Sequence, residues 1–373
     1  MAEASPTLHQ PIRDHKRIAK AVARWFTTNA RELPWREEDP SLGRRDAYRS
    51  LVSELMLQQT QVSRVLEKFD PFLTRFPSIQ ALASADEQEI LAAWSGLGYY
   101  RRARLLHAAA KDIVEHHLGE VPRDTQDLQS ITGIGRYTAG AIASIVFNQP
   151  APIVDGNVSR VLMRLRADGR SAADSAATKQ NWADAEQLAK AAPSPAKTNE
   201  GLMELGALIC TPKTPRCEDC PLRASCRAAD LGIQLQIPAP KPTTKRSVIH
   251  HTSVIIRTAD GRLLIERRPA SGLWASMWQA PTAESAQRAP RPATILRKLG
   301  LSVKSRKIGE FSHITSHREV RFRIYRLAED LPAHQIEALA RPDAYAAIAP
   351  SELGDFALAN PHRRMLEDAA KSP

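Results

Sequence analysis

Apolar residues in the first two thirds of the chain recur at intervals of three and four positions. One stripe of this kind consists of Leu51, Leu55, Val62, Leu66 and Phe69. Strict alternation of apolar and polar residues is scarce in the same region. This period predicts a mainly α-helical domain over residues 15–230.

Capping residues and glycines indicate where some of these helices begin and end. Ser84 stands three positions before Glu87, which is the spacing of a capping box, and the helix it would start ends near Trp94. The glycine-containing segment 96–98 then interrupts the helical pattern, and the next helix is expected to run to about His117.

Residues 231–246 predict a linker. This segment contains Pro238, Pro240 and Pro242 among lysines, and the fixed φ angle and missing N–H of proline suit an extended chain. We therefore expect a domain boundary here.

Beyond the linker the period of the pattern becomes two. Residues 247–256 and 262–267 alternate on either side of an Asp-Gly turn at 260–261, and residues 320–327 alternate again. These features predict an α+β domain over residues 247–373.

Composition adds a partner class to this organisation. The chain has 373 residues with 43% hydrophobic content, enough to bury two cores, and 52 Lys and Arg against 41 Asp and Glu give a formal net charge of +11. A polyanionic partner is therefore favoured, with nucleic acid first. The N-terminal sequence lacks an apolar segment and the uncharged stretch 137–154 is interrupted by polar residues and prolines, so we expect a cytoplasmic protein without a membrane helix.

The four cysteines lie close together. Cys210, Cys217, Cys220 and Cys226 are separated by six, two and five residues. Four thiolates can close around one metal centre, whereas two disulfides in so short a loop would be strained and would need an oxidising compartment. Structural zinc is the stronger alternative, although four-cysteine zinc sites usually contain two close pairs and this segment has one. The spacing resembles the [4Fe-4S] loop of the helix-hairpin-helix DNA glycosylases.

A glycine turn lies between two helical stretches upstream of the cysteines. Gly133 and Gly135 would let backbone N–H groups approach a phosphate at the start of the following helix. An ordinary tight turn between packed helices explains the two glycines equally well when they are taken alone.

Two carboxylates have settings that suit chemistry. Asp155 precedes an apolar helical run as a preferred N-cap, where the helix N-terminus would favour its anion. Glu54 stands among apolar residues of an amphipathic helix, and partial burial would raise its pKa so that it holds a proton near neutrality as a general acid. The alternatives are a simple cap and a solvated helix-face glutamate.

Six segments together resemble the MutY-type adenine DNA glycosylases. They are LPWR (33–36), SELMLQQTQV (53–62), GLGYYRRARLLH (96–107), GIGRYTAGAIAS (133–144), VDGNVSR (154–160) and ELGALICT (204–211). The resemblance spans nearly all of residues 15–230 and implies a helix-hairpin-helix glycosylase fold with a [4Fe-4S] cluster on the 210–226 loop. It further implies a monomeric, nucleoid-associated repair enzyme that excises adenine opposite 8-oxoguanine or guanine in duplex DNA.

The resemblance also assigns roles to individual residues. Glu54 matches the acid that protonates the departing adenine, and Asp155 matches the carboxylate that stabilises or traps the oxocarbenium-like sugar. The remaining implied residues are Tyr137 and Asn157 at the reacting sugar, Arg31, Trp35, Leu57 and Val62 around the flipped adenine, and Gln59, Thr60, Tyr99, Gly133 and Gly135 at the DNA. Tyr99 and its neighbour Tyr100 could equally be core residues.

Tyr137 distinguishes two classes of glycosylase. Related enzymes that also cut the DNA backbone carry a lysine at this place, which forms a Schiff base with the sugar. A tyrosine offers no amine, so the resemblance implies a monofunctional glycosylase.

Residues 247–373 resemble a Nudix hydrolase fold without its metal-binding signature. Ala293-Thr294 and Arg297-Lys298 stand where a working Nudix helix carries an Arg-Glu pair and two glutamates. Bases in place of acids would repel Mg²⁺, so we expect recognition rather than pyrophosphatase activity.

The resemblance places 8-oxoguanine recognition in one tripeptide of this domain. Phe311, Ser312 and His313 match the loop that contacts the lesion, with the serine hydroxyl at the oxidised purine edge. Taken alone, this tripeptide is more typical of a strand end.

Three other functions compete with this interpretation. A bifunctional glycosylase/lyase is disfavoured by Tyr137 and by the C-terminal domain, and a non-catalytic DNA-binding protein by the presence of both Glu54 and Asp155. A nucleotide pyrophosphatase is disfavoured by the missing glutamates.

Overall fold

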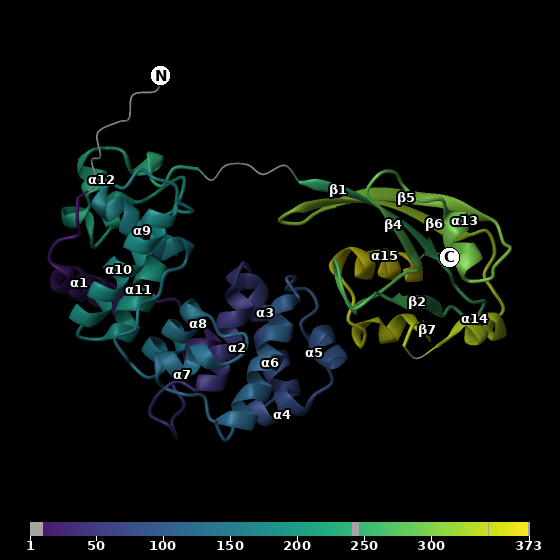
Figure 1. Ribbon diagram of the computed structural model, residues 1–373, viewed down its shortest axis with the longest axis horizontal. Coiled ribbons are helices and arrows are strands. Elements are labelled where there is room, and N and C mark those ends of the chain that lie inside the picture. The colour runs from purple at the N-terminus through teal and green to yellow at the C-terminus, as the bar shows by residue number, and fades with distance from the viewer. Residues whose placement is uncertain (1–9, 241–245, 342, 372–373) are drawn as a thin grey trace. The chain divides into compact units, whose positions relative to one another are not determined.

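The computed structural model describes residues 10–240, 246–341 and 343–371 (Figure 1). By packing, the chain divides into two compact units. The described parts of the first are residues 10–69, 76–83 and 105–240, and those of the second are residues 70–75, 84–104, 246–341 and 343–371. The division passes through α3 (Val62–Arg75) and α6 (Arg101–His116). It therefore differs from the domains expected from the sequence, whose boundaries stay a prediction.

The first unit is helical, as the period of the pattern predicted. Besides its parts of α3 and α6 it contains α1 (His15–Asn29), α2 (Ala47–Leu57), most of α4 (Ile79–Ser84), α7 (Thr125–Ser130), α8 (Arg136–Ala141), α9 (Gly156–Arg166), α10 (Ser175–Ala191), α11 (Pro195–Leu208) and α12 (Arg227–Asp230). Helices α1, α9, α10 and α11 enclose a common apolar core (Figure 1). Ile18, Val22 and Phe26 of α1 recur every four residues and are buried, so this helix turns one face to the core.

The predicted stripe from Leu51 to Phe69 is interrupted. Helix α2 ends at Leu57, and Gln59 adopts a left-handed φ of 56° before α3 begins. The break resets the helical phase, so Val65 and Phe69 are buried while Leu66 is 42% exposed. The expectation that Leu66 belongs to the buried stripe was wrong, because a period read across a break assumes one continuous helix.

The predicted capping box at Ser84 was also wrong. Ser84 ends α4, and α5 (Glu87–Ala93) is capped by Asp86, whose carboxylate accepts a hydrogen bond from the backbone N–H of Gln88. An aspartate next to the first turn adds a favourable charge at the helix N-terminus that a serine two positions earlier does not supply.

The first part of the predicted linker packs against the first unit. Ile237 is 2% exposed and its carbonyl accepts a hydrogen bond of 2.9 Å from Nε of Arg164. The backbone N–H of Ala239 donates to the carbonyl of Arg170. Residues 241–245 of the expected linker lie outside the described residues.

The second unit contains two sheets with helices around them. One sheet has the order β4-β1-β6-β5 and the other the order β3-β2-β7. The strands are β1 (Ser247–Ile255), β2 (Leu263–Arg267), β3 (Trp278–Gln279), β4 (Thr282–Ser285), β5 (Ser305–Ile314), β6 (Arg318–Leu327) and β7 (Tyr345–Ile348), and the helices beyond residue 246 are α13 (Pro292–Lys298), α14 (Ala333–Leu339) and α15 (Asn360–Lys371). The predicted α+β character and the strand over 320–327 are confirmed.

The strands around the turn at Asp260-Gly261 pair beside it, through the bridge between Arg257 and Leu263, and then continue into different sheets. The turn forms, with the backbone N–H of Thr258 donating to the carbonyl of Arg262 over 2.9 Å. Strand β1 nevertheless pairs with β4 and β6, whereas β2 pairs with β3 and β7. Alternation and turn residues identify strands, but partner choice depends on the packing of the whole unit.

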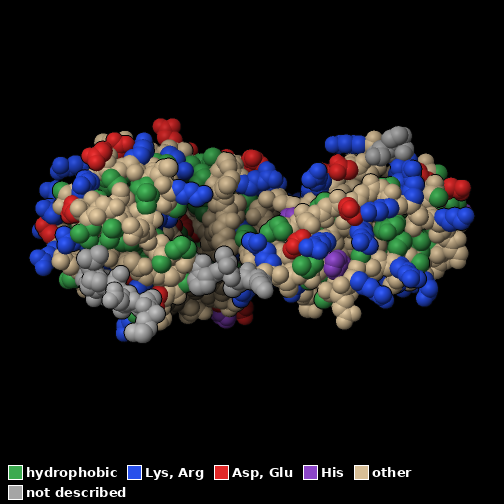
Figure 2. Space-filling model, turned by 90° about the horizontal axis from the view of Figure 1, so that it is seen from above, with side chains coloured by type: hydrophobic (Ala, Val, Ile, Leu, Met, Phe, Trp, Pro, Cys, Tyr) green, Lys and Arg blue, Asp and Glu red, His purple; other side chains and the backbone are tan. Residues whose placement is uncertain are grey.

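Basic side chains are spread over both parts of the surface drawn in Figure 2. Such a distribution is consistent with the positive net charge and with a polyanionic partner. Among the described residues, no helix has both the length and the apolar character that crossing a membrane requires.

Candidate functional site

Glu54 and Tyr137 come together in the first unit although 83 residues separate them in sequence. Glu54 stands on α2 between the buried residues Ser53 and Leu55. The hydroxyl of Tyr137, on the helix after the glycine turn, donates a hydrogen bond of 3.0 Å to Oε2 of Glu54. The packing of α2 against α8 therefore builds a carboxyl–phenol pair.

This environment gives Glu54 an acid strength suited to neutral pH. Burial raises its pKa to about 7, with nearby Glu200 and Asp155 adding to the rise and the Tyr137 hydrogen bond opposing it. The residue as a whole is half-buried. The sequence-based expectation of a raised pKa agrees with this environment. Burial also raises the pKa of Tyr137 well above its ordinary value, which keeps the phenol neutral as a donor.

Asp155 is the N-cap of α9, as predicted. Its Oδ1 accepts a hydrogen bond of 2.7 Å from the backbone N–H of Val158, and its Oδ2 accepts one of 3.3 Å from Nδ2 of Asn157. The negative charge of Asp155 contributes to the raised pKa of both Glu54 and Tyr137, which places the three groups in one cluster.

The expected effect of the helix N-terminus on Asp155 needs correction. Burial raises the pKa of Asp155, and the hydrogen bonds from Val158 and Asn157 and the charge of Arg160 offset only part of that rise. The Asp155 anion is therefore less stable here than at an exposed N-cap, because the free energy lost by removing water from the carboxylate exceeds the free energy gained from its capping hydrogen bonds.

A buried network of ion pairs beside this cluster was missed by sequence reasoning. Glu204 on α11 accepts paired hydrogen bonds of 2.8 Å each from Nε and Nη2 of Arg31, and Glu200 accepts from Arg36 and Arg45. Burial acts to raise the pKa of Glu204, but hydrogen bonds from Arg31 and Arg36 outweigh it and hold that pKa at about 2. Two glutamates four positions apart, with Gly201, Leu202 and Met203 between them, are the pattern that could have predicted buried ion pairs.

Arg160 joins the Asp155 region to the cysteine loop. Its Nη2 donates to Oδ1 of Asn157 over 2.9 Å and to the carbonyl of Gly206 over 2.7 Å, while its Nε donates to the carbonyl of Cys210 over 2.7 Å. A side chain at Gly206 would place Cβ only 2.6 Å from Cβ of Asn157, so this approach of α11 to α9 requires glycine.

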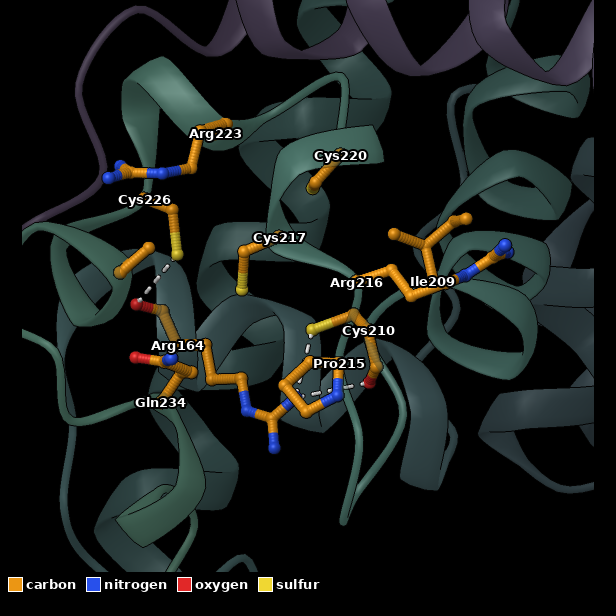
Figure 3. Close-up of a pocket in the computed structure, with 11 residues that line it drawn as sticks. Arg164, Ile209, Cys210, Pro215, Arg216, Cys217, Cys220, Arg223, Cys226 and Gln234 are labelled. Carbon is orange, nitrogen blue, oxygen red and sulfur yellow. Dashed lines mark hydrogen bonds between the residues drawn. The ribbon is translucent and has the colours of Figure 1, made fainter.

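The four cysteines line one pocket, shown in Figure 3. The structure holds all four as free thiols. Arg164 lies beside them and donates a hydrogen bond of 3.2 Å to Sγ of Cys210 and one of 2.8 Å to the carbonyl of Thr211. Among the described residues, no three His, Cys, Asp or Glu side chains converge closely enough to hold a metal ion as they stand.

The donor set of this pocket fits a multiply charged metal group. Burial chiefly, with the neighbouring thiols adding to it, raises the pKa of Cys220 to about 11. Four thiolates can share so small a space only with compensating positive charge, which Zn²⁺ or an iron–sulfur cluster provides and which Arg164 supplements. The residues therefore fit both Zn²⁺ and an iron–sulfur cluster.

The glycine turn has one position that only glycine can occupy. Gly133 has a φ of +91°, and a Cβ there would lie 2.7 Å from the carbonyl oxygen of Leu105. Gly135 has an ordinary φ of −88° with open space around it, and it is the N-cap of α8. The turn thus leaves exposed backbone at the start of a helix, which is the arrangement expected for phosphate contact.

The two adjacent tyrosines have different surroundings. Tyr100 is buried and its hydroxyl donates to the carbonyl of Leu358 in the second unit, to which both residues belong. Tyr99 is 48% exposed with a φ of 48°, and its hydroxyl lies 2.9 Å from Oγ of Ser316 in the same unit. Tyr100 is therefore a core residue, whereas Tyr99 is available for contact.

The Phe311-Ser312-His313 tripeptide is part of strand β5, not of a loop. Phe311 stacks on Phe322 with ring centroids 4.7 Å apart, and His313 lies against Trp274 at 5.8 Å. Ser312 faces the opposite side of the strand and is exposed. The tripeptide taken alone predicted a strand, and this is confirmed. The loop that the resemblance implied was wrong for the backbone of these residues.

The other residues expected at the adenine and DNA have mixed settings. Trp35 is buried against Phe69 in a T-shaped pair at 5.4 Å, and Leu57 and Val62 are half-buried on either side of the exposed Gln59. Thr60 is half-buried. Their roles at an adenine or a duplex stay predictions.

Known proteins are similar to this chain in both of its parts. A family model described as "HhH-GPD superfamily base excision DNA repair protein" matches residues 52–187, which include Glu54, Tyr137 and Asp155, and a NUDIX domain model matches residues 252–368. The adenine DNA glycosylase of Homo sapiens is 34% identical over 393 residues, covering 87% of this chain and 70% of the human protein. The chain belongs to the adenine DNA glycosylase family.

Other similar proteins include the adenine DNA glycosylase of Buchnera aphidicola, which is 32% identical with 80% of this chain and 84% of that protein covered. A solved structure of a thermostable thymine-DNA glycosylase matches 58% of this chain and 97% of its own with a TM-score of 0.49 at 26% identity. Membership makes this chain a DNA-repair glycosylase, a hydrolase of the N-glycosidic bond of adenine. The expected family and fold class are confirmed.

Proposed function

We propose that this adenine DNA glycosylase excises adenine mispaired with 8-oxoguanine or guanine in duplex DNA, with Glu54 as general acid and Asp155 as the stabilising carboxylate. The observation that carries the assignment is the Glu54–Tyr137 pair, 3.0 Å apart, in which burial raises the pKa of the carboxyl to about 7. A carboxyl with this pKa is substantially protonated at neutral pH and can still release its proton.

The first step is transfer of the Glu54 proton to N7 of adenine. Protonation makes the base a better leaving group, and the bond between N9 and C1′ then breaks with its electron pair leaving on adenine. The hydroxyl of Tyr137 donates to Oε2 of Glu54 and so orients the carboxyl and stabilises the carboxylate that forms.

The second role is stabilisation of the sugar cation. Breaking the bond leaves positive charge on C1′ and the ring oxygen, and Asp155 opposes it by charge or by forming a transient bond to C1′. Burial makes the free Asp155 anion costly, as its raised pKa indicates, so a cation beside it is strongly favoured. Addition of one water at C1′, with its released proton taken up by the Glu54 carboxylate, then gives an abasic site.

The enzyme is monofunctional in this proposal. Tyr137 stands where a lyase carries its lysine, and a neutral phenol cannot form a Schiff base with the opened sugar. Strand cleavage therefore needs a separate treatment or enzyme.

We assign the cysteine loop to a [4Fe-4S] cluster held by Cys210, Cys217, Cys220 and Cys226. Bound there, the cluster supplies a rigid cross-link of the loop and leaves the hydrolysis to the side chains of the active site. The 6-2-5 spacing favours it over zinc because only one close cysteine pair is present. Duplex DNA is the partner in this proposal, the protein acts as a monomer, and the cytoplasm at the nucleoid is the expected location.

The remaining roles follow the family resemblance. Arg31, Trp35, Leu57 and Val62 surround the flipped adenine, Asn157 supports Asp155, and Gln59, Thr60, Tyr99, Gly133 and Gly135 contact the duplex. Ser312 reads the base opposite the adenine, supported by Phe311 and His313. Exposure of Tyr99 and Ser312 supports contact roles for both.

One assay tests the proposal. Duplexes with adenine opposite 8-oxoguanine, guanine or thymine are incubated with the full chain, with and without alkali, and strand cleavage is measured. The proposal requires alkali-dependent cleavage at adenine, fastest opposite 8-oxoguanine. Cleavage without alkali at the same rate would identify a lyase, and no cleavage with intact DNA binding would identify a non-catalytic protein.

A further inference from the structure

Ser312 belongs to a row of polar side chains on the exposed face of the four-stranded sheet. It pairs in register with Arg321 of β6, and Arg321 pairs with His250 of β1. Strand β5 is at the edge of that sheet. The hydroxyl of Ser312 is therefore accessible to a base approaching the sheet edge.

A carboxylate two residues before Arg321 on the same face of β6 binds both Ser312 and Arg321. Oε1 of Glu319 accepts a hydrogen bond of 3.3 Å from the hydroxyl of Ser312 and one of 2.7 Å from Nε of Arg321. The second oxygen, Oε2, accepts from Nη2 of Arg321 over 3.3 Å. Arg321 chiefly, with Ser312 adding to it, lowers the pKa of Glu319, so the carboxylate is ionised at neutral pH.

The charge of Glu319 decides which way the serine hydroxyl points. An ionised carboxylate can only accept hydrogen bonds, so in this contact the hydrogen of Ser312 must point to Glu319. The lone pairs of the serine oxygen are then left facing outward. Ser312 presents an acceptor to a ligand and has no hydrogen left to donate.

An outward acceptor distinguishes two purines that differ at one atom. Guanine has a lone pair at N7, whereas 8-oxoguanine carries a hydrogen on N7 and is a donor there. An acceptor-only hydroxyl bonds to N7–H of 8-oxoguanine and meets the lone pair of guanine with repulsion. A freely rotating hydroxyl could donate to guanine and would discriminate less.

We propose that Glu319 is a positioning residue that holds the hydroxyl of Ser312 as a hydrogen-bond acceptor and thereby selects a purine with a hydrogen on N7. This inference rests on the proposed function, in which Ser312 reads the base opposite the adenine. It adds a residue and a chemical reason for the preference.

The test is the Glu319→Leu variant of the full chain, compared with the wild type for single-turnover excision of adenine opposite 8-oxoguanine and opposite guanine. The preference for 8-oxoguanine should fall about five- to tenfold, mainly because guanine becomes a better opposing base. In a Ser312→Ala background, Glu319→Leu should leave the preference unchanged. Thermal unfolding of each variant shows that the fold is kept, since both side chains lie on the exposed face.

Glu310 provides a control matched in charge. It lies on the same face of β5, is exposed, and pairs with Lys307 at 2.6 Å. Glu310→Leu removes the same charge near the DNA, so it should change excision opposite both bases by the same factor. An equal loss of preference in Glu310→Leu would mean that charge alone causes the effect and would overturn the proposal.

A guanine analogue gives an independent readout. In 7-deazaguanine the N7 lone pair is replaced by C–H, so the wild type should excise adenine faster opposite 7-deazaguanine than opposite guanine. Glu319→Leu should lose this advantage, because its freely rotating Ser312 hydroxyl can donate to N7 of guanine but finds no acceptor at C7 of 7-deazaguanine. A variant that keeps the wild-type order for all three bases would overturn the role of Glu319.

Failure of the two proposals can be told apart. If the wild type has no preference for 8-oxoguanine, or if Ser312→Ala keeps the full preference, the lesion-reading function of Ser312 is wrong and the role of Glu319 is wrong with it. If Ser312→Ala loses preference and Glu319→Leu does not, only the inference about Glu319 is wrong.

Discussion

The protonation of Glu54 controls the proposed reaction at the scale of single residues. Its pKa of about 7 means that the acid form is lost as the pH rises past neutrality. The single-turnover excision rate should be level below about pH 6 and fall about tenfold per pH unit well above pH 7. Tyr137→Phe removes a hydrogen bond that lowers this pKa, so the midpoint of its residual activity should move to higher pH. A rate that keeps rising above pH 8 would contradict the assignment.

Ionisation of the buried Glu54 carboxyl should destabilise the folded protein at high pH. Its pKa rises from 4.5 in the unfolded chain to about 7 in the folded one, so the folded state binds more protons between these values and stability falls as the pH increases through them. Glu54→Gln should be inactive, yet at pH 8 it should be more stable than the wild type by roughly 1 to 3 kcal/mol. Urea unfolding at pH 8 measures the gain, and the gain should vanish below about pH 4.5. A variant less stable than the wild type at pH 8 would disprove the burial argument.

Asp155 combines a capping role with a proposed electrostatic one, and a substitution separates them. Asparagine caps helices about as well as aspartate and carries no buried charge, so Asp155→Asn should be at least as stable as the wild type at neutral pH. The charge beside the sugar cation is lost, and the single-turnover rate should fall by about 100-fold or more. An unchanged rate would leave Asp155 as a cap only.

The turn before α8 tests the DNA contact at the scale of elements. Gly133→Ala forces a Cβ to 2.7 Å from the carbonyl of Leu105 at a φ of +91°, and should cost about 1 to 3 kcal/mol of stability together with DNA affinity. Gly135→Ala is the control for stability, since its φ is ordinary and its surroundings are open. Thermal unfolding and DNA binding measure both variants. Equal behaviour of the two would show that the turn is not constrained by its backbone.

Arg164 connects α9 to the cysteine loop and offers a second test at this scale. It is 2% exposed, and its guanidinium donates to Sγ of Cys210 and to carbonyls of the same loop. Arg164→Met leaves these acceptors unpaired, which should cost about 2 to 4 kcal/mol and lower the iron and acid-labile sulfide bound per chain. Lys213→Ala, an exposed change on the same loop, should leave both unchanged. Full iron content in Arg164→Met would show that the cysteine loop binds its metal group without help from Arg164.

At the scale of the whole molecule, the net charge of +11 should set the affinity for any duplex. The preference for 8-oxoguanine over guanine should not depend on that charge. Affinity for any duplex should fall steeply between about 50 and 200 mM salt, because each phosphate contact releases counterions. The ratio of affinities for 8-oxoguanine and guanine duplexes should stay constant over that range, because it depends on contacts at one base edge. Equilibrium binding at several salt concentrations measures both. A ratio that falls in parallel with affinity would mean that electrostatics produces the preference.

Features that depend on neighbouring residues could be predicted from the amino-acid sequence. The change of period near residue 240, the cap at Asp155, the glycine turn at Gly133 and the spacing of the four cysteines were all visible in the chain. Helix period, capping and turn conformation are set by interactions over a few residues, so a linear pattern contains them. The expectations failed where a local pattern was extended across a break, as at Leu66, or where a nearby cap competed, as at Ser84.

Properties that depend on groups distant in sequence could not be predicted without the folded structure. The pKa of Glu54 comes from burial and from a phenol 83 residues away, and the raised pKa of Asp155 reverses what its helix position alone indicated. The division of β1 and β2 between two sheets was likewise fixed by partners far along the chain. Desolvation and charge act through space, so the pKa of a buried group depends on which residues pack around it. A pattern of neighbouring residues in the sequence does not contain that information.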